Sequence, residues 1–234
     1  MRIVFFSDQN TTYNAYDLDG QIRHKLDFIR QYVPSHIKLY IVSHSIGCHM
    51  SLQVLKRLQE QNSATRVEKM IMLFPTIKHM ADTRHGKIAS PLLRYFQWFA
   101  YLLVVLLSYL SPIVQYRMVL WYFAGKRVAG CAYNAALNLF NPTCTHNYMY
   151  LADHELKQVR DPDYQFIHDN IEKIVLYYGV KDHWCPVSYF DEMKALFPDG
   201  DIHLCQRNFE HAFVLRHSKE MAPIVWDWVA KCRT

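Results

Sequence analysis

KLYIVSHSIG, at residues 38–47, decides the fold, because it joins a short apolar run rich in β-forming residues to a tight turn that carries a serine. A helical pattern follows, from about Cys48 to Gln59. A strand, a sharp turn and a helix form the setting of the G-x-S-x-G nucleophile elbow. Ser45 takes the serine position and Gly47 the last small position, while Ser43 stands where glycine is usual. The stretch predicts an exposed serine hydroxyl at the end of a buried strand.

The rest of the chain alternates strands and helices around this stretch. An amphipathic pattern over residues 22–33 precedes it and is stopped by Pro34, and another closes the chain over residues 221–229. The strands are apolar on both faces, which indicates a mostly parallel sheet with helices on both sides. The sequence predicts one α/β domain over residues 1–234. Further strands are expected at residues 3–6, 69–74, 173–178 and 201–205.

Composition excludes several classes of protein. Apolar residues make up 51% of the chain and charged residues 20%, so it has enough apolar side chains for a full core and is not of the disordered class. The net charge of +5 comes without a run of more than two Lys or Arg residues, so nucleic-acid binding is not expected. The six cysteines form neither a C-x-x-C pair nor a zinc-ligand spacing, so no metal site or disulfide framework is expected.

A serine nucleophile needs a base to take its proton and an acid to orient that base. In α/β-hydrolases, the order along the chain is serine, acid and histidine. Asp182 follows the strand expected at residues 173–178, and His211 lies between the last strand and the last helix. The pattern predicts Ser45, Asp182 and His211 as catalytic residues, with the backbone N–H of Ile46 as an oxyanion donor.

Each of these residues also has a simpler interpretation. An aspartate after a strand is commonly a turn former or a helix cap, and one histidine among thirteen is commonly a surface or packing residue. Asp191, Glu192 and Glu210 compete for the role of the acid, but they lie in an expected helix or too close to the histidine. His44, inside the elbow, either shapes an acyl pocket or only packs.

The segment over residues 78–168 interrupts the alternation and is expected to be a helical insertion between two strands. Its apolar segment, residues 95–125, has no charged residue from Tyr95 to Tyr116. The run is long enough to cross a bilayer, but Pro112 near its end and the aromatic residues at both margins favour a shallow hairpin. Because the serine precedes the insertion and the acid and base follow it, both ends must lie on one side of a membrane. A lid packed on the hydrolase core is the alternative.

With these residues in place, the sequence resembles the lipid-droplet-associated hydrolase family of the α/β-hydrolase superfamily. The resemblance implies a serine hydrolase acting on neutral lipids, with sterol esters among the candidates, at the cytosolic face of lipid droplets and the endoplasmic reticulum. It implies no metal or organic cofactor, and by position it gives the same three catalytic residues. The similar stretches are DLDGQIRHKLDFIRQYVP (17–34), HSIG (44–47), LFPTIKHM (73–80), GKIASPLL (86–93), YYGVKDHWCP (177–186), FPDGDIHLC (197–205) and EHAF (210–213).

One departure from that family concerns the N-terminal region. Its members begin with further strands and a G-N-P-G-like loop that supplies a second oxyanion donor, and nothing before Tyr16 matches it. We therefore expect an N-terminally truncated α/β-hydrolase fold with low activity, because losing one donor typically costs on the order of 10²–10³ in rate. The other expected function is a non-catalytic droplet protein that uses the fold and the apolar insertion to influence lipid storage.

Overall fold

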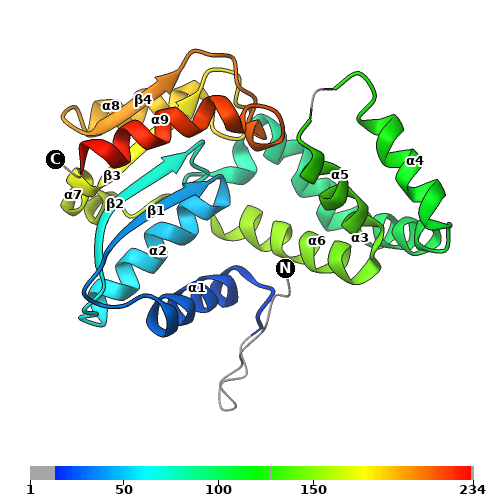
Figure 1. The fold of residues 1–234 in the computed structure, drawn as a ribbon, viewed down its shortest axis with the longest axis horizontal. Coiled ribbons are helices and arrows are strands. Elements are labelled where there is room, and N and C mark those ends of the chain that lie inside the picture. The colour runs from blue at the N-terminus through cyan, green and yellow to red at the C-terminus, as the bar shows by residue number, and fades with distance from the viewer. Residues whose placement is uncertain (1–13, 127, 233–234) are drawn as a thin grey trace.

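The computed structural model describes residues 14–126 and 128–232, and within them it contains a parallel four-stranded sheet (Figure 1). The strand expected at residues 3–6 lies outside the described residues. The other four expected strands are present in the order β1-β2-β3-β4, and all neighbours pair in parallel. The strands are β1 (Lys38–His44), β2 (Arg66–Leu73), β3 (Ile174–Gly179) and β4 (Asp201–Cys205).

Helices cover both faces of the sheet, and the side chains of β2 explain why. Met70 and Met72 belong to the core on one face, and Ile71 and Leu73 belong to the core on the other, so β2 has no face for solvent. The first core contains residues of α1 (Leu18–Tyr32), α2 (Ile46–Glu60) and α8 (Val187–Leu196); the second contains residues of α9 (Ser218–Lys231). This is the α/β-hydrolase architecture that the sequence predicts.

Most of the chain between β2 and β3, from α3 to α6, forms a helical layer that faces the carboxyl ends of the strands (Figure 1). Its long helix α3 begins at Arg84, where the Thr83 side chain accepts a hydrogen bond from the N–H of Gly86. The expected break at Pro112 is present, because that proline is the first residue of α4. The helices of the layer are α3 (Arg84–Ser108), α4 (Pro112–Tyr122), α5 (Gly130–Leu137) and α6 (Pro142–Gln158). The same segment contains α7 (Tyr164–Asp169), beside the start of β3, and the short 3-10 turns η1 (Met80–Asp82), η2 (Asn138–Phe140) and η3 (Ile171–Lys173), while η4 (Phe213–Leu215) follows β4.

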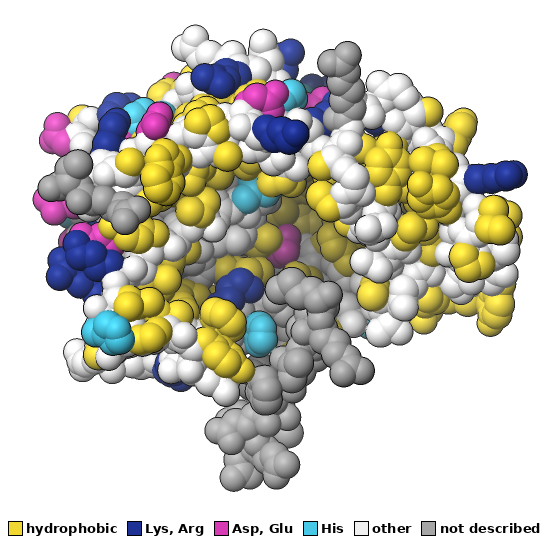
Figure 2. Space-filling view, viewed as in Figure 1, with side chains coloured by type: hydrophobic (Ala, Val, Ile, Leu, Met, Phe, Trp, Pro, Cys, Tyr) yellow, Lys and Arg dark blue, Asp and Glu magenta, His cyan; other side chains and the backbone are white. Residues whose placement is uncertain are grey.

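The apolar face of this layer is exposed. Within the described residues, α3 is the one helix long and apolar enough to span a membrane, and none of its most apolar stretch is buried. Tyr109 is 84% exposed and Trp121 81% exposed, far more than large aromatic side chains in a soluble core. Figure 2 shows hydrophobic side chains spread over this layer and a hollow between it and the sheet. The layer therefore carries a large apolar surface that is exposed and does not cover the sheet.

Candidate active site

Ser45 lies in the strained turn that an elbow requires. Its φ is 57° and its ψ is −129°, a conformation that typically costs a non-glycine residue on the order of 1–3 kcal/mol. The turn is held by its own backbone, because the Ser45 N–H donates to the carbonyl of Leu73 at 3.1 Å and the Ser45 carbonyl accepts from the N–H of Cys48 at 2.9 Å. The hydroxyl is thereby presented between the end of β1 and the start of α2.

His211 makes one hydrogen bond through each ring nitrogen. Its Nε2 lies 2.7 Å from Ser45 Oγ, and its Nδ1 lies 2.7 Å from Asp182 Oδ2. An ionised carboxylate only accepts, so Nδ1 carries the ring proton and Nε2 is left to accept from the serine hydroxyl. This is the relay that general-base activation of a serine needs. The structure thus brings together all three residues expected as a triad.

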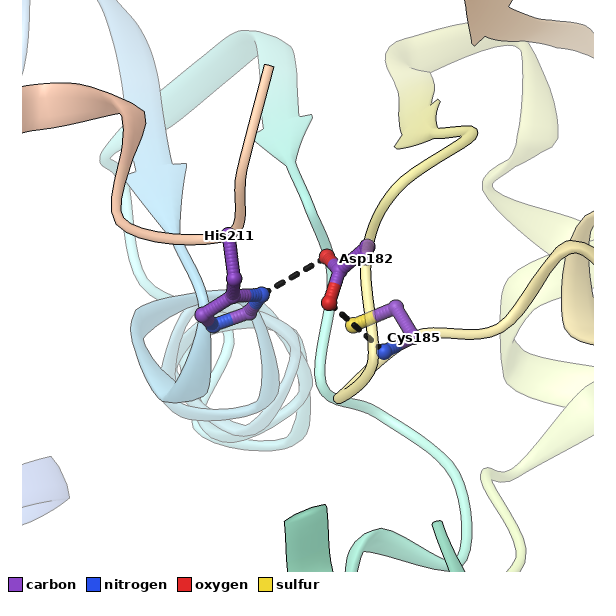
Figure 3. Close-up of side chains that lie close together, drawn as sticks. All are labelled: Asp182, Cys185 and His211. Carbon is purple, nitrogen blue, oxygen red and sulfur yellow. Dashed lines mark hydrogen bonds and ion pairs between the residues drawn. The ribbon is translucent and has the colours of Figure 1, made fainter. Parts of the chain in front are cut away.

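Asp182 is buried, and its second oxygen is held by the turn that follows it. Its side chain is fully enclosed, and Oδ1 accepts from the backbone N–H of Trp184 at 2.7 Å. The same oxygen accepts from the backbone N–H of Cys185 at 3.0 Å (Figure 3). These two donors fix the carboxylate so that Oδ2 faces His211. Sequence reasoning did not identify them, because a backbone N–H leaves no signature in the residue types.

The competing acids face other partners. Glu192 pairs with Lys78, and its Oε1 also accepts from the Tyr164 hydroxyl at 3.0 Å. Glu210 pairs with Arg216, with Oε2 3.5 Å from Nη1. Asp191 is exposed on α8. None of the three acids is hydrogen-bonded to the ring of His211.

The Cys185 thiol lies close to Asp182 and His211, so these three side chains form a group of possible metal ligands. The thiol is fully buried and its Sγ lies 3.3 Å from the carbonyl oxygen of Phe74. Burial, together with the nearby Asp182 charge, raises the pKa of Cys185 well above its ordinary value. A neutral thiol is a poor metal ligand, and both Asp182 oxygens are already engaged, so the group fits an acid–base pair better than a metal site.

The backbone N–H of Ile46 is placed as an oxyanion donor would be. Ile46 is the first residue of α2, directly after Ser45, and the first N–H groups of a helix have no partner within it. The same helix end carries partial positive charge. An anion that forms beside Ser45 would therefore meet both a free donor and a favourable field.

The helical layer contacts both loops that carry Asp182 and His211. At the start of α3, the N–H of His85 donates to the carbonyl of His183, next to Asp182, at 3.4 Å. Before α5, the N–H of Ala129 donates to the carbonyl of Leu215 in η4, which follows His211, at 2.9 Å. The layer therefore packs directly on the loops that carry Asp182 and His211.

His44 contacts the backbone of His211 through its side chain, a bond that sequence reasoning missed. Its Nε2 lies 2.8 Å from the backbone carbonyl oxygen of His211. Its ring also lies against His211 and Phe213, with ring centroids 5.2 and 4.9 Å apart. The residue types alone could not indicate this bond, because it joins positions 167 residues apart.

Known proteins resemble the chain in sequence and in fold. The family described as lipid-droplet associated hydrolase matches residues 6–214. A lipid droplet-associated hydrolase of Gallus gallus is 38% identical over 98% of this chain and 70% of its own length, and that of Homo sapiens is 38% identical over 92% and 64%. The chain thus spans about two thirds of the length of these relatives.

Solved structures give the fold at much lower identity. A variant of a meta-cleavage product hydrolase has a TM-score of 0.61 at 16% identity, covering 97% of this chain and 76% of its own. A carboxylesterase linked to the archaeon Nitrososphaera gargensis has the same TM-score at 15% identity, covering 96% and 75%. These likenesses establish an α/β-hydrolase fold. The family match over residues 6–214 and the sequence relatives show that the chain belongs to the lipid droplet-associated hydrolase family.

Proposed function

We propose that the protein hydrolyses carboxylic esters of neutral lipids at the surface of lipid droplets, with Ser45 as the nucleophile. The observation that carries the proposal is the pair of 2.7 Å hydrogen bonds that link Ser45 to His211 and His211 to Asp182. A packing histidine has no need of two such partners, one of them a serine in a strained turn. Sterol esters are among the substrates that fit, because their ester bond needs the same chemistry.

The proposed reaction has two halves. Ser45 Oγ attacks the ester carbonyl carbon while His211 Nε2 takes the hydroxyl proton, and the resulting oxyanion lies beside the N–H of Ile46. The C–O bond to the alcohol then breaks, and the alcohol leaves with the proton from His211. Water attacks the acyl-serine, again giving a proton to His211, and releases the fatty acid as Ser45 recovers its proton. Asp182 holds the Nδ1 proton throughout, so Nε2 is the nitrogen that takes and returns the proton, and the carboxylate stabilises the imidazolium that forms.

The apolar segment over residues 95–125 is proposed to lie in the lipid surface as a shallow hairpin of α3 and α4. Each large apolar side chain taken out of water contributes roughly 1.5–3 kcal/mol. The exposed residues Trp98, Tyr109 and Trp121 alone would gain several kcal/mol, comparable to the whole stability of a domain. Both ends of the hairpin would face the cytosol, at the droplet surface or at the endoplasmic reticulum membrane.

The test is labelling by a fluorophosphonate probe, which reacts with an activated serine. Wild type is expected to be labelled, Ser45→Ala is expected to be unlabelled, and Ser35→Ala, an exposed loop serine, is the matched control. Labelling that survives Ser45→Ala would refute this nucleophile. A folded wild-type protein that never reacts would favour the non-catalytic droplet protein. Turnover is proposed to be low, and ester hydrolysis by the purified protein measures it directly.

A further inference from the structure

The bond between His44 and His211 has a fixed direction. The carbonyl oxygen of His211 only accepts, so the proton lies on Nε2 of His44 and the His44 ring is the donor, over 2.8 Å. Across residues 14–126 and 128–232, this is the only hydrogen bond that the carbonyl of His211 receives. The backbone of the base is thus tied to another element at one point, and that point is the side chain of His44.

The two ends of this bond differ in rigidity. His44 is the last residue of β1, paired with Leu73 of β2, and it directly precedes Ser45. His211 lies in the loop that follows β4, which contains a positive φ at Asn208 and no regular secondary structure before η4. A donor on the sheet that holds a carbonyl on a loop restricts the loop, because strands hold functional groups more precisely than loops do.

The surroundings of His44 keep it a neutral donor. Phe213 and Phe74 lie against its ring edge-on, with centroids 4.9 and 6.3 Å away. Burial, and then the neighbouring His211 ring, lower the pKa of His44 to about 4. His44 is therefore uncharged at neutral pH, and it places no second positive charge beside the imidazolium that forms on His211 during the reaction.

We propose that His44 is a positioning residue for the catalytic base: its Nε2–H holds the backbone of His211 so that the ring stays within hydrogen-bond reach of both Ser45 and Asp182. This inference rests on the proposed function for its consequence in catalysis. A base displaced by about 1 Å costs on the order of 100-fold in rate, so the effect falls on the chemical step and leaves substrate binding unchanged.

Two substitutions that differ by one methylene test the bond. The amide of Gln reaches about as far as Nε2 of His, whereas that of Asn ends near the position of Nδ1. His44→Gln is expected to keep the rate of fluorophosphonate inactivation within about threefold, and His44→Asn and His44→Leu are expected to slow it by roughly 10–100-fold with the probe's binding constant unchanged. Thermal unfolding of each variant shows whether it is folded. If His44→Leu is not folded, the comparison of His44→Gln with His44→Asn decides the role of His44.

The second readout is the low-field proton resonance of His211 Nδ1, assigned by its loss in Asp182→Asn. It is expected to remain sharp in wild type and His44→Gln and to broaden in His44→Asn, whether or not the protein turns over. A wild type that does not react with the probe would refute the proposed function, and the resonance would still decide the role of His44. Equal inactivation rates and resonances in wild type, Asn and Leu variants would overturn the positioning role, as would equal losses in Gln and Asn variants.

Discussion

The Nε2 atom of His211 lies 2.7 Å from the hydroxyl oxygen of Ser45, although 166 positions separate the two residues in the chain. The chain between them includes the helical layer of α3 to α6, which leaves the sheet after β2 and returns before β3. The layer contacts both loops at its edges, through His85 and Ala129. A substitution that displaces the layer can therefore also displace either loop.

Asp182→Asn is expected to reduce turnover by roughly 10⁴-fold while leaving the protein folded. The Asn carbonyl can still accept from the N–H groups of Trp184 and Cys185, but its amide then faces His211 Nδ1. Nδ1 must become an acceptor, so Nε2 is protonated and is no longer able to take the proton of Ser45. The measurement is ester turnover or probe labelling. Asp191→Asn, at an exposed acid on α8, is the control, and an equal loss in that variant would contradict the assignment.

Gly86→Ala is expected to lower the free energy of unfolding by about 1–3 kcal/mol, and by more if the helix start is displaced. A Cβ at this position would lie 2.0 Å from the carbonyl oxygen of Met80, so α3 could not keep its place against η1. Gly130→Ala is the matched control, since a Cβ there meets no atom within 4 Å. Chemical denaturation of both variants measures the difference. Equal stabilities would show that this close approach does not position α3.

Trp98→Glu and Trp121→Glu are each expected to weaken droplet binding by at least about 30-fold, because each tryptophan contributes roughly 2 kcal/mol or more when it enters lipid. Both side chains are largely exposed, so their replacement leaves the core intact. Trp226→Glu, at an exposed tryptophan of α9, is the control.

Flotation of tagged variants with isolated droplets is the measurement. Deletion of residues 95–125 should release the protein altogether. A deleted form that still floats would place the lipid contact elsewhere.

Glu155 should make stability fall as pH rises toward neutrality. Burial raises the pKa of this α6 carboxyl from 4.5 to about 7, so the folded state holds a proton that the unfolded state has already lost. The contribution of this pKa shift to stability is complete below the unfolded pKa of 4.5, and it is lost as pH rises through the folded pKa of about 7. Glu155→Gln should then raise the free energy of unfolding at pH 8 by an amount on the order of 3 kcal/mol.

The measurement is the difference in unfolding free energy between wild type and Glu155→Gln across pH 4 to 8. The difference is needed because His44 and His49, whose pKa values burial lowers to about 4, act in the opposite direction over part of that range. A difference that does not change with pH would mean that Glu155 titrates normally.

Sequence reasoning identified the elements with a continuous apolar pattern and missed the polar ends of others. The strand β2 begins at Arg66 and not at residue 69, because Arg66 and Glu68 pair with each other at the sheet end and interrupt the apolar run. The helix α3 begins at Arg84, well before the apolar segment, because Thr83 caps a first turn that carries no apolar stripe. An apolar pattern marks the part of an element that leaves water, and the polar ends of β2 and α3 carry no such pattern.

The same limit applies to the site. The residue types and order of Ser45, Asp182 and His211 are visible in one sequence because each follows a strand. The hydrogen bond of His44 and the burial of Glu155 depend on residues that meet only after the whole chain has folded, so no spacing rule predicts them.

The length of the continuous helix α3 bears on which molecules can reach Ser45. The helix runs for 25 residues, about 37 Å, from the hydrogen bond between His85 and His183 to its apolar far end. With residues 95–125 embedded as proposed, residues 84–94 of α3, about 16 Å of helix, would join the lipid surface to the loop that carries Asp182. The helix would then act as a spacer of fixed length. Such a spacer would favour molecules whose ester group rises into the interfacial layer over the same molecules dissolved in the oil beneath it.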